Sequence, residues 1–303
     1  MPAALFLFLC PGNDRGIGTG TAVLKSRHSL AVTKGIIMQV GKSIRMERLM
    51  NRDTKRSVIV PMDHGVSVGP ITGLEDMRRA VGEVAEGGAD AVLGHKGLIR
   101  CGHRKGGRDV GLILHLSSST DLSPHPNAKT LTASVTDALK LGADGISMHV
   151  NLGDPTEATM LSDLGKVASE AHDWGVPLLV MIYARGPKIN DPFAPATIAH
   201  CARVAMELGA DLVKVPYTGD MDSFARVVES CCVPVLIAGG PKTDTTRDFL
   251  QVVSDSVKAG GAGISVGRNV FQHPKPRLLT SALSGIVHAN WSVEQALAVV
   301  GEE

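Results

Sequence analysis

The sequence predicts an α/β fold, a (β/α)8 TIM barrel, on three observations. Short apolar runs alternate with amphipathic segments from Ser57 to about Arg268. The same junction recurs along this stretch, a helix end followed by GGAD, LGAD or GGAG and then an apolar run. Eight strand–helix units in about 230 residues suit this barrel. No GxGxxG opens the first strand–helix turn, which argues against the alternative, a doubly wound open sheet.

The eight predicted strands are short and apolar on both faces, as expected for parallel strands covered on both sides. They span residues 57–63, 90–96, 111–117, 145–151, 177–183, 212–217, 233–240 and 262–268. One of them, LVKVPY, is interrupted by Lys214. Because lysine is almost never fully buried without a partner or a function, this residue needs an explanation.

Amphipathic segments between the strands predict helices, because apolar residues recur there at steps of three and four. These helices cover residues 74–88, 157–175, 197–209 and 244–261. Glycines at the helix exits are expected to take the left-handed conformation that turns the chain back. The segment 97–109 is too rich in glycine and charge for a good helix. Ser292 and Gln295 have the spacing of a capping box, which predicts an extra helix near the C-terminus.

The composition excludes several classes of protein. The chain has 303 residues, 44% of them hydrophobic, enough for one large barrel domain, which we expect over residues 41–303. Its 31 basic and 30 acidic side chains and its 3% aromatic content argue against a nucleic-acid partner. Five cysteines without a CxxC pair indicate a reduced, cytoplasmic protein. No apolar run reaches the roughly 18 residues of a membrane span, so no membrane partner is expected.

Residues 1–40 show no clear periodicity of apolar residues that would predict a helix or a strand. Their apolar stretch AALFLFLC lacks the charged start and the small-residue cleavage site of a secretory signal, which is the alternative. We expect a disordered or dispensable extension that results from an over-early start codon, with Met38 or Met46 nearer the true start.

Polar residues gather at the carboxyl ends of the predicted strands, where barrel enzymes place their reactive groups. They are Asp63, His64, Lys96, His115, His149, Tyr183, Arg185, Lys214, Gly239, Gly240, Gly267 and Arg268. Because these strand ends meet at one mouth, the sequence predicts a single active site there.

Lys214 is the predicted nucleophile of this site. It shares one face of its strand with Leu212 and Pro216, and we expect that face to line the barrel interior. Desolvation favours the neutral amine, which attacks a ketone and forms a Schiff base. The iminium then stabilises a carbanion on the neighbouring carbon, so that carbon–carbon bonds form or break. The alternative is a structural lysine paired with Asp63.

Proton transfer is assigned to Tyr183 and Asp63. The phenol of Tyr183 can exchange a proton with an alkoxide, and the carboxylate of Asp63 can accept one. The alternatives are half-buried packing for the tyrosine and a loop cap or an ion pair for the aspartate.

Phosphate binding is predicted where AGGPK and VGRN end the last two strands, the usual phosphate site of barrel enzymes. Gly239, Gly240 and Gly267 let the backbone approach the anion, and Arg268 supplies charge.

A zinc site is the competing chemistry. His64, His115 and His149 stand at strand ends and offer the right ligand atoms, but they lie on different strands without an H-x-H pair. We therefore expect no metal, and hydrogen bonds from these histidines to substrate hydroxyls.

Seven stretches together resemble the archaeal-type class I aldolases, and more narrowly their 2-amino-3,7-dideoxy-D-threo-hept-6-ulosonate synthase branch. They read VPMDHGVSVGPI, GHKGLIRCGHR, GLILHLS, ISMHVNLG, VKVPYTGD, AGGPKT and VGRNVFQH, and the resemblance runs from about Gly41 to near the C-terminus. It implies that Lys214 is the Schiff-base lysine, Tyr183 the proton donor and Asp63 the proton acceptor. The substrate contacts it implies are His64, Gly65, Val66, Ser67, Ala184, Arg185, Gly239, Gly240, Gly267 and Arg268.

The resemblance also implies a transaldolase that needs neither cofactor nor metal. A phosphorylated ketose, 6-deoxy-5-ketofructose 1-phosphate, would form the imine and be cleaved, and the bound fragment would add to L-aspartate 4-semialdehyde. The product feeds an alternative route to 3-dehydroquinate and aromatic amino acids. Members of the family form large homo-oligomers, so we expect a homo-oligomer here.

Three other functions stay open on the sequence. HLSSST and Pro216 differ from the family pattern and fit the related bacterial enzymes that join L-aspartate 4-semialdehyde to dihydroxyacetone phosphate. A fructose-1,6-bisphosphate aldolase needs a second phosphate site, for which His103, Arg104, Lys105 and Arg108 are available. A sugar-phosphate-binding regulator predicts the loss of a catalytic group, and none is lost.

Overall fold

The structure is a computed structural model that describes residues 39–102, 109–239 and 245–302. The chain from Met38 to Glu303 forms one compact unit. The expected extension over residues 1–40 lies outside the described residues, apart from its last two. Within the described ranges, no helix has both the length and the apolar character needed to cross a membrane.

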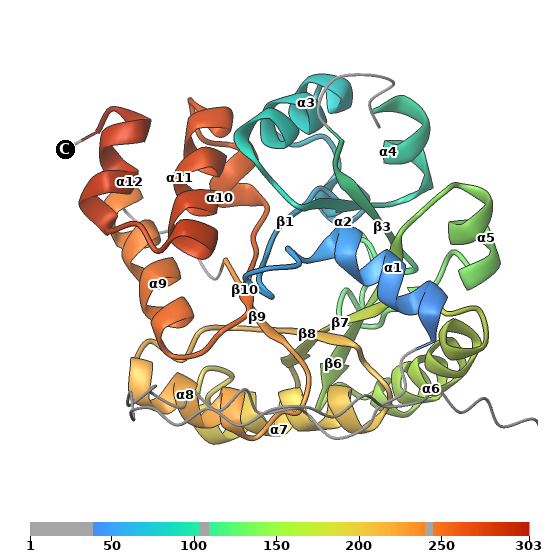
Figure 1. Ribbon diagram of the computed structural model, residues 1–303. Coiled ribbons are helices and arrows are strands. Elements are labelled where there is room, and N and C mark those ends of the chain that lie inside the picture. Colours follow the sequence, from blue (N-terminus) through green and yellow to red (C-terminus); the bar gives the residue numbers. More distant parts are fainter. Residues whose placement is uncertain (1–38, 103–108, 240–244, 303) are drawn as a thin grey trace, which may run out of the picture. The chain divides into compact units, whose positions relative to one another are not determined.

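Eight parallel strands close into a barrel, which confirms the predicted fold class (Figure 1). Around the barrel the order is β1, β10, β9, β8, β7, β6, β3 and β2. The bounds are β1 Ser57–Pro61, β2 Ala91–Gly94, β3 Gly111–His115, β6 Gly145–Leu152, β7 Leu178–Ala184, β8 Leu212–Val215, β9 Val235–Ala238 and β10 Gly263–Ser265. Each strand lies within a predicted strand or extends one residue beyond it.

Helices surround this barrel (Figure 1). They are α1 Val40–Leu49, α2 His64–Val68, α3 Met77–Gly87, α4 Lys96–Cys101, α5 Val135–Lys140, α6 Glu157–Asp173, α7 Pro195–Glu207, α8 Met221–Glu229, α9 Thr246–Lys258, α10 Arg268–Phe271, α11 Pro276–Ala289 and α12 Val293–Val300. The four predicted helices appear as α3, α6, α7 and α9, and α4 is short, as its glycine and charge content predicts. The capping box before α12 forms through Ser292 and Gln295.

Glycines turn the chain back at the repeated helix–strand junctions. Gly88, Gly142, Gly209 and Gly260 have φ angles of +98°, +76°, +101° and +95°. This left-handed conformation is open to glycine at little cost, which explains why the junction recurs in the sequence.

A small hairpin, which the sequence analysis did not predict, stands outside the barrel. β4 (Ser117–Ser118) pairs antiparallel with β5 (Thr130–Leu131). Because β4 follows almost directly on β3, the hairpin lies at the carboxyl ends of the strands. The backbone N–H of His149 donates to Ser117 Oγ at 2.9 Å and links the hairpin to β6.

The amino-terminal end of the barrel is closed by α1. Leu49 and Met50, at the end of this helix, belong to the same apolar cluster as the interior residues Ile59 and Ile113. Lys42 anchors the helix, because its Nζ bonds both carboxylate oxygens of Asp211 at 3.0 and 2.9 Å, just before β8. The interior is therefore sealed at this end.

Side chains along the strands alternate between two apolar clusters. The interior cluster contains Met181, Leu212 and Leu236, whereas Val213 and Val215 belong to the cluster between strands and helices. Cross-strand partners point to the same face of a sheet. Since Lys214 pairs with Met181 on β7 and Leu236 on β9, its side chain points into the barrel, as predicted.

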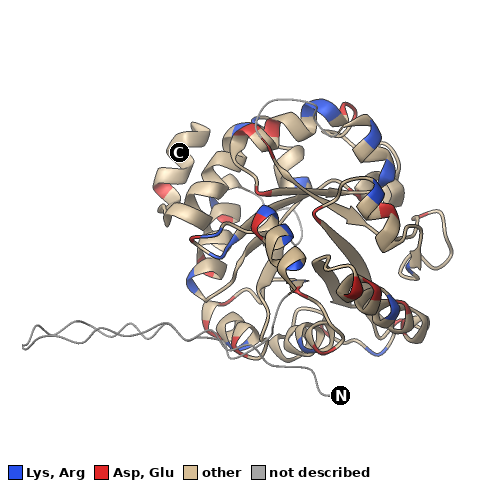
Figure 2. Ribbon diagram, turned by 45° about the vertical axis from the view of Figure 1, so that its right-hand side comes forward, with Lys and Arg blue, Asp and Glu red and all other residues tan. Residues whose placement is uncertain are grey.

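Charged side chains of both signs are interspersed on the outer helices, while the strands are largely uncharged (Figure 2). No face in this view is dominated by one sign, in keeping with the balanced composition.

Replacing Gly263 with alanine should destabilise the barrel where β10 meets β1. Gly263 has φ +112°, and a Cβ atom there would lie 2.0 Å from the carbonyl oxygen of Ser57. Because only backbone stands in the way, we expect the free energy of unfolding in urea to fall by about 3 kcal/mol or more. Gly165→Ala on α6 is the control, since its Cβ would meet nothing within 4 Å. Equal effects of the two substitutions would contradict this account.

Candidate active site

Lys214 lies at the bottom of a cavity at the carboxyl ends of the strands. Only 7% of the residue is exposed, and its nearest polar contact is Met181 Sδ at 3.7 Å from Nζ. No carboxylate oxygen of the described residues lies within 4.0 Å of the amine, so the alternative ion pair with Asp63 does not form. The amine is thus buried, without a carboxylate partner, and open to a ligand.

The cavity has a volume of about 520 Å³ and brings most of the predicted site together. Its lining includes His64, Tyr183, Ala184, Arg185, Lys214, Gly239, Gly267 and Arg268. Asp63, Gly65, Val66 and Ser67 do not line it: Gly65 borders a separate hollow, and Val66 is exposed. Gly240 lies outside the described residues, as do His103, Arg104, Lys105 and Arg108.

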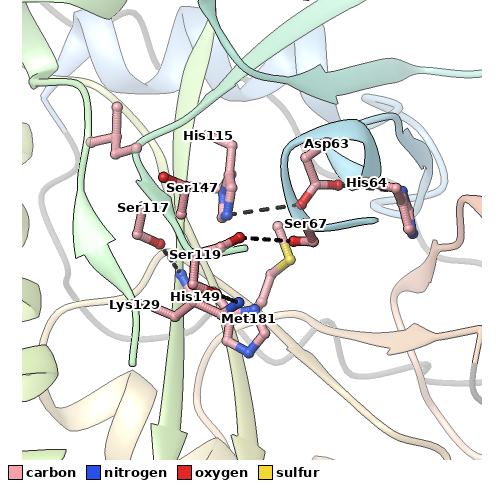
Figure 3. A network of polar contacts seen from close by, with 12 residues as sticks. Asp63, His64, Ser67, His115, Ser117, Ser119, Lys129, Ser147, His149 and Met181 are labelled. Atoms are coloured by element: carbon pink, nitrogen blue, oxygen red, sulfur yellow. Dashed lines mark hydrogen bonds and ion pairs between the residues drawn. The ribbon is translucent and has the colours of Figure 1, made fainter. Parts of the chain in front are cut away.

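Asp63 follows β1 and faces a group of imidazoles (Figure 3). Its Oδ2 is 3.8 Å from His115 Nε2, and its Oδ1 is 3.7 Å from His64 Nδ1. Burial alone would raise the pKa of this carboxyl, but the positive charges of His115, His64 and His95, which are protonated in acid, and of Lys214 outweigh it and hold the pKa well below its usual value. Asp63 is therefore ionised at neutral pH, the state that a proton acceptor needs.

The imidazoles themselves are neutral. Burial lowers the pKa of His115 to about 4 and that of His149 well below its ordinary value. Protein groups already occupy one nitrogen of each ring: His115 Nδ1 lies 2.8 Å from Ser147 Oγ, and His149 Nε2 lies 2.8 Å from Asn151 Oδ1. Only the other nitrogen of each ring is left for a substrate.

Tyr183 stands at the carboxyl end of β7, half-buried, and lines the cavity with Lys214. Its ring lies between the His149 ring, at a centroid distance of 5.0 Å, and the Arg185 guanidinium, whose Cζ is 4.8 Å from the centroid. The phenol makes no hydrogen bond to any described side chain. It is held in position by its ring and is free to bond a ligand.

The predicted phosphate end of the cavity is formed by backbone. A Cβ at Gly239 would lie 2.7 Å from Val266 Cγ1, and one at Gly267 would lie 2.4 Å from the carbonyl oxygen of Pro61, so neither position accepts a side chain. Asn269 Nδ2 fixes the first turn by donating to Gly239 O at 3.3 Å.

Three residues of the site were missed from the sequence. Ser265, on the inward face of β10, lines the cavity with a buried hydroxyl that has no partner among the described residues. His95 packs on His115 with ring centroids 5.2 Å apart. Its neighbour Lys96, which the sequence placed at the mouth, instead forms an ion pair with Asp137, with Nζ 3.0 Å from Oδ2. Lys129, in the loop of the β4–β5 hairpin, is half-buried beside the mouth.

One group among the described residues could hold a metal ion. Ligand atoms of Asp63, His95 and His115 lie within 4.8 Å of one another. Of the three histidines weighed from the sequence, only His115 belongs to this group. Neutral imidazoles and an ionised carboxylate are ligands that zinc accepts.

Comparison with known proteins identifies the family. The family model for DeoC/LacD family aldolases matches residues 57–273. The chain belongs to this family. It is an enzyme of the Schiff-base, class I aldolase type, as the sequence motifs predicted.

Relatives of this aldolase include two kinds of synthase. It is 44% identical over 262 residues to a 2-amino-3,7-dideoxy-D-threo-hept-6-ulosonate synthase of Halobacterium salinarum, covering 86% of this chain and 97% of the relative. It is 41% identical over 260 residues to a 2-amino-4,5-dihydroxy-6-oxo-7-(phosphonooxy)heptanoate synthase of Streptomyces griseus, covering 86% of this chain and 95% of the relative.

Solved structures agree with this assignment. A Schiff-base-forming fructose-1,6-bisphosphate aldolase superposes with a TM-score of 0.75 at 33% identity, covering 82% of this aldolase and 100% of the other chain. An archaeal fructose-1,6-bisphosphate aldolase, with its catalytic lysine covalently bound to a carbinolamine intermediate, superposes with a TM-score of 0.75 at 32% identity, covering 81% and 99%.

Acid should destabilise the protein through His115. Its pKa in the folded state, about 4, lies below the ordinary 6.5, so between these values only the unfolded chain binds the proton. Stability is therefore present above pH 6.5 and lost as the pH falls toward 4. Between pH 7 and 5 this histidine should remove about 2 kcal/mol from the free energy of unfolding.

The measurement is urea unfolding at pH 7 and at pH 5. His115→Asn should lose less stability over this interval than the unmodified protein, whereas His200→Asn, at an exposed site on α7, should follow the unmodified protein. The same loss in all three proteins would refute the assignment.

Proposed function

We propose that this aldolase makes 2-amino-3,7-dideoxy-D-threo-hept-6-ulosonate from 6-deoxy-5-ketofructose 1-phosphate and L-aspartate 4-semialdehyde. The relative of that name in Halobacterium salinarum supports the choice. The product would feed an alternative route to 3-dehydroquinate and aromatic amino acids, and the enzyme would act as a homo-oligomer.

One observation carries the proposal: Lys214 is 7% exposed, has no carboxylate partner among the described residues and opens into the cavity that Tyr183, Gly239 and Gly267 also line. The neutral amine is the form that attacks a carbonyl, and burial away from water favours a neutral amine. A lysine buried for structural reasons alone would be expected to pair with a carboxylate, because an unpaired buried charge is costly.

The chemistry begins with attack of Lys214 Nζ on a ketone of the donor and loss of water. In the iminium, the bond between the α and β carbons breaks and its electrons form an enamine. The β-hydroxyl gives up its proton, and the β carbon leaves as an aldehyde. The enamine carbon then attacks the aldehyde carbon of the acceptor, the new alkoxide takes a proton, and water releases the product from the lysine.

Asp63 and Tyr183 would move these protons. Asp63 is ionised and accepts the proton of the β-hydroxyl, with the neutral rings of His115 and His64 beside it. Tyr183, whose phenol has no partner among the described side chains, donates to the new alkoxide. His64, Ala184 and Arg185, which line the cavity, would contact the substrate.

A second donor, dihydroxyacetone phosphate, is favoured by the position of the phosphate turns. Gly239, Gly267 and Arg268 border the same cavity as Lys214. In 2-amino-4,5-dihydroxy-6-oxo-7-(phosphonooxy)heptanoate the phosphate sits on the carbon next to the ketone, so the imine fragment would carry it. With 6-deoxy-5-ketofructose 1-phosphate that carbon is a methyl group, and the phosphate leaves with the aldehyde.

Borohydride reduction in the presence of each donor separates the two reactions. Mass spectrometry should find a three-carbon adduct without phosphate after incubation with 6-deoxy-5-ketofructose 1-phosphate. If dihydroxyacetone phosphate is the donor, the adduct keeps its phosphate. Product formation with L-aspartate 4-semialdehyde is measured alongside. Cleavage of fructose 1,6-bisphosphate without any use of the semialdehyde would overturn the proposal.

Lys214→Met should abolish the adduct and lower turnover by about a thousandfold or more, because no other lysine among the described residues lines the cavity. Lys96→Met is the matched control, since this lysine also stands near the carboxyl end of a barrel strand, here at the start of α4 after β2, but pairs with Asp137. The control should keep both adduct and turnover. A labelled peptide without Lys214, or turnover retained in Lys214→Met, would contradict the proposed mechanism.

A further inference from the structure

Lys129 is a half-buried lysine beside the mouth of the barrel, and none of the proposed covalent or proton-transfer steps uses it. Lys129 directly precedes β5 in the hairpin that follows β3. Its Nζ donates to Ser119 Oγ, and Figure 3 shows it beside Ser119 and His149. The half-buried lysine therefore lies against the His149 side of the site.

Hydrogen bonds fix the hairpin loop in this place. The carbonyl oxygen of Asn127, two residues before Lys129, accepts from Asn151 Nδ2 at 2.7 Å. Asn151 Oδ1 in turn bonds His149 Nε2 at 2.8 Å. On the other side, Ser67 Oγ donates to the carbonyl oxygen of Ser119 at 3.3 Å. The loop is tied to the end of β6 and to α2, the helix that follows β1, so these hydrogen bonds hold Lys129 in place.

A second cation stands on the same side of the mouth. Arg185 lies over the Tyr183 ring, and the His149 ring packs against the same tyrosine. Burial and the charge of Arg185 lower the pKa of Lys129, while Asp63 and Asp121 oppose this. Yet neither cation forms an ion pair within 4.0 Å in the part of the chain that the structure describes. Two neighbouring cations without an ion-pair partner among the described residues suit an anionic ligand.

The strand order shows which part of the substrate would meet them. The phosphate turns end β9 and β10, Lys214 is on β8 and Tyr183 on β7, and next come β6 and β3, which carry the hairpin. Dihydroxyacetone phosphate held on Lys214 with its phosphate at β9 and β10 would present its reactive carbon toward Tyr183. The aldehyde that reacts with it must therefore enter from the side of β6 and β3.

We propose that Lys129, with Arg185, binds the α-carboxylate of the acceptor aldehyde. This inference rests on the proposed function, because it concerns the second substrate of that reaction. The two side chains come from different elements, a hairpin loop and the end of β7, and would grip the carboxylate while its aldehyde carbon lies near the Tyr183 phenol. Lys129 is thus a specificity residue and takes no part in bond making.

The test compares acceptors that differ in charge. With the donor that the enzyme uses, kcat/KM is measured for L-aspartate 4-semialdehyde, succinate semialdehyde, glyceraldehyde 3-phosphate and propanal. In Lys129→Met we expect a fall of about 10- to 100-fold for the two carboxylated aldehydes, the effect of losing one charge-assisted hydrogen bond. The value for propanal should not change, and Lys129→Arg should restore part of the loss.

Borohydride trapping of the donor on Lys214 should be unchanged in Lys129→Met, which also shows that the variant folds. Lys166→Met, at an exposed site on α6, is the matched control and should behave as the unmodified enzyme.

An equal fall for propanal, or no fall for the carboxylated aldehydes, would overturn this inference while leaving the proposed function intact. A fall confined to glyceraldehyde 3-phosphate would also overturn it and make the subsite a phosphate site. If the unmodified enzyme traps a donor but does not use L-aspartate 4-semialdehyde, the proposed function itself fails.

Discussion

Strand alternation in a closed parallel barrel decides where Lys214 stands, and the rest of the site is arranged around that position. The residues before and after it point outward into the apolar layer under the helices. Its cross-strand partners Met181 and Leu236 line the interior. Since a closed sheet has no edge at which the strand could slip, the amine cannot turn to solvent without breaking the barrel.

The charges of the site are ordered around this amine. Asp63 is the anion, and the imidazoles nearest to it are neutral, because burial keeps protons off them. The cations Arg268, Arg185 and Lys129 stand at the rim, and Arg268 and Arg185 border the cavity. A reaction centre with neutral imidazoles and a single carboxylate, and with positive groups at its margin, suits substrates that carry a ketone or an aldehyde in the middle and anions at their ends.

Much of this could be predicted from the sequence, because periodicity reports burial. The eight strands and four of the helices follow from apolar spacing, and Lys214 stood out as a charge in an apolar run. Lys129 does not interrupt an apolar run, because it lies in a loop, and only the folded structure shows that it stands beside His149 on β6. Lys96 misled for the opposite reason: it ends a predicted strand, but α4 begins at this residue and carries it away from the mouth. Ser265 is a small residue within an apolar strand, and the sequence around it does not indicate that its hydroxyl lines the cavity.

The helix that seals the amino-terminal end of the barrel bears on the order of events in catalysis. With Leu49 and Met50 filling that end, a ligand reaches Lys214 through the mouth and leaves the same way. The first aldehyde must therefore depart before the second can take its place over the enamine. A transaldolase built on this scaffold is constrained to a ping-pong sequence, and its double-reciprocal plots should be parallel lines.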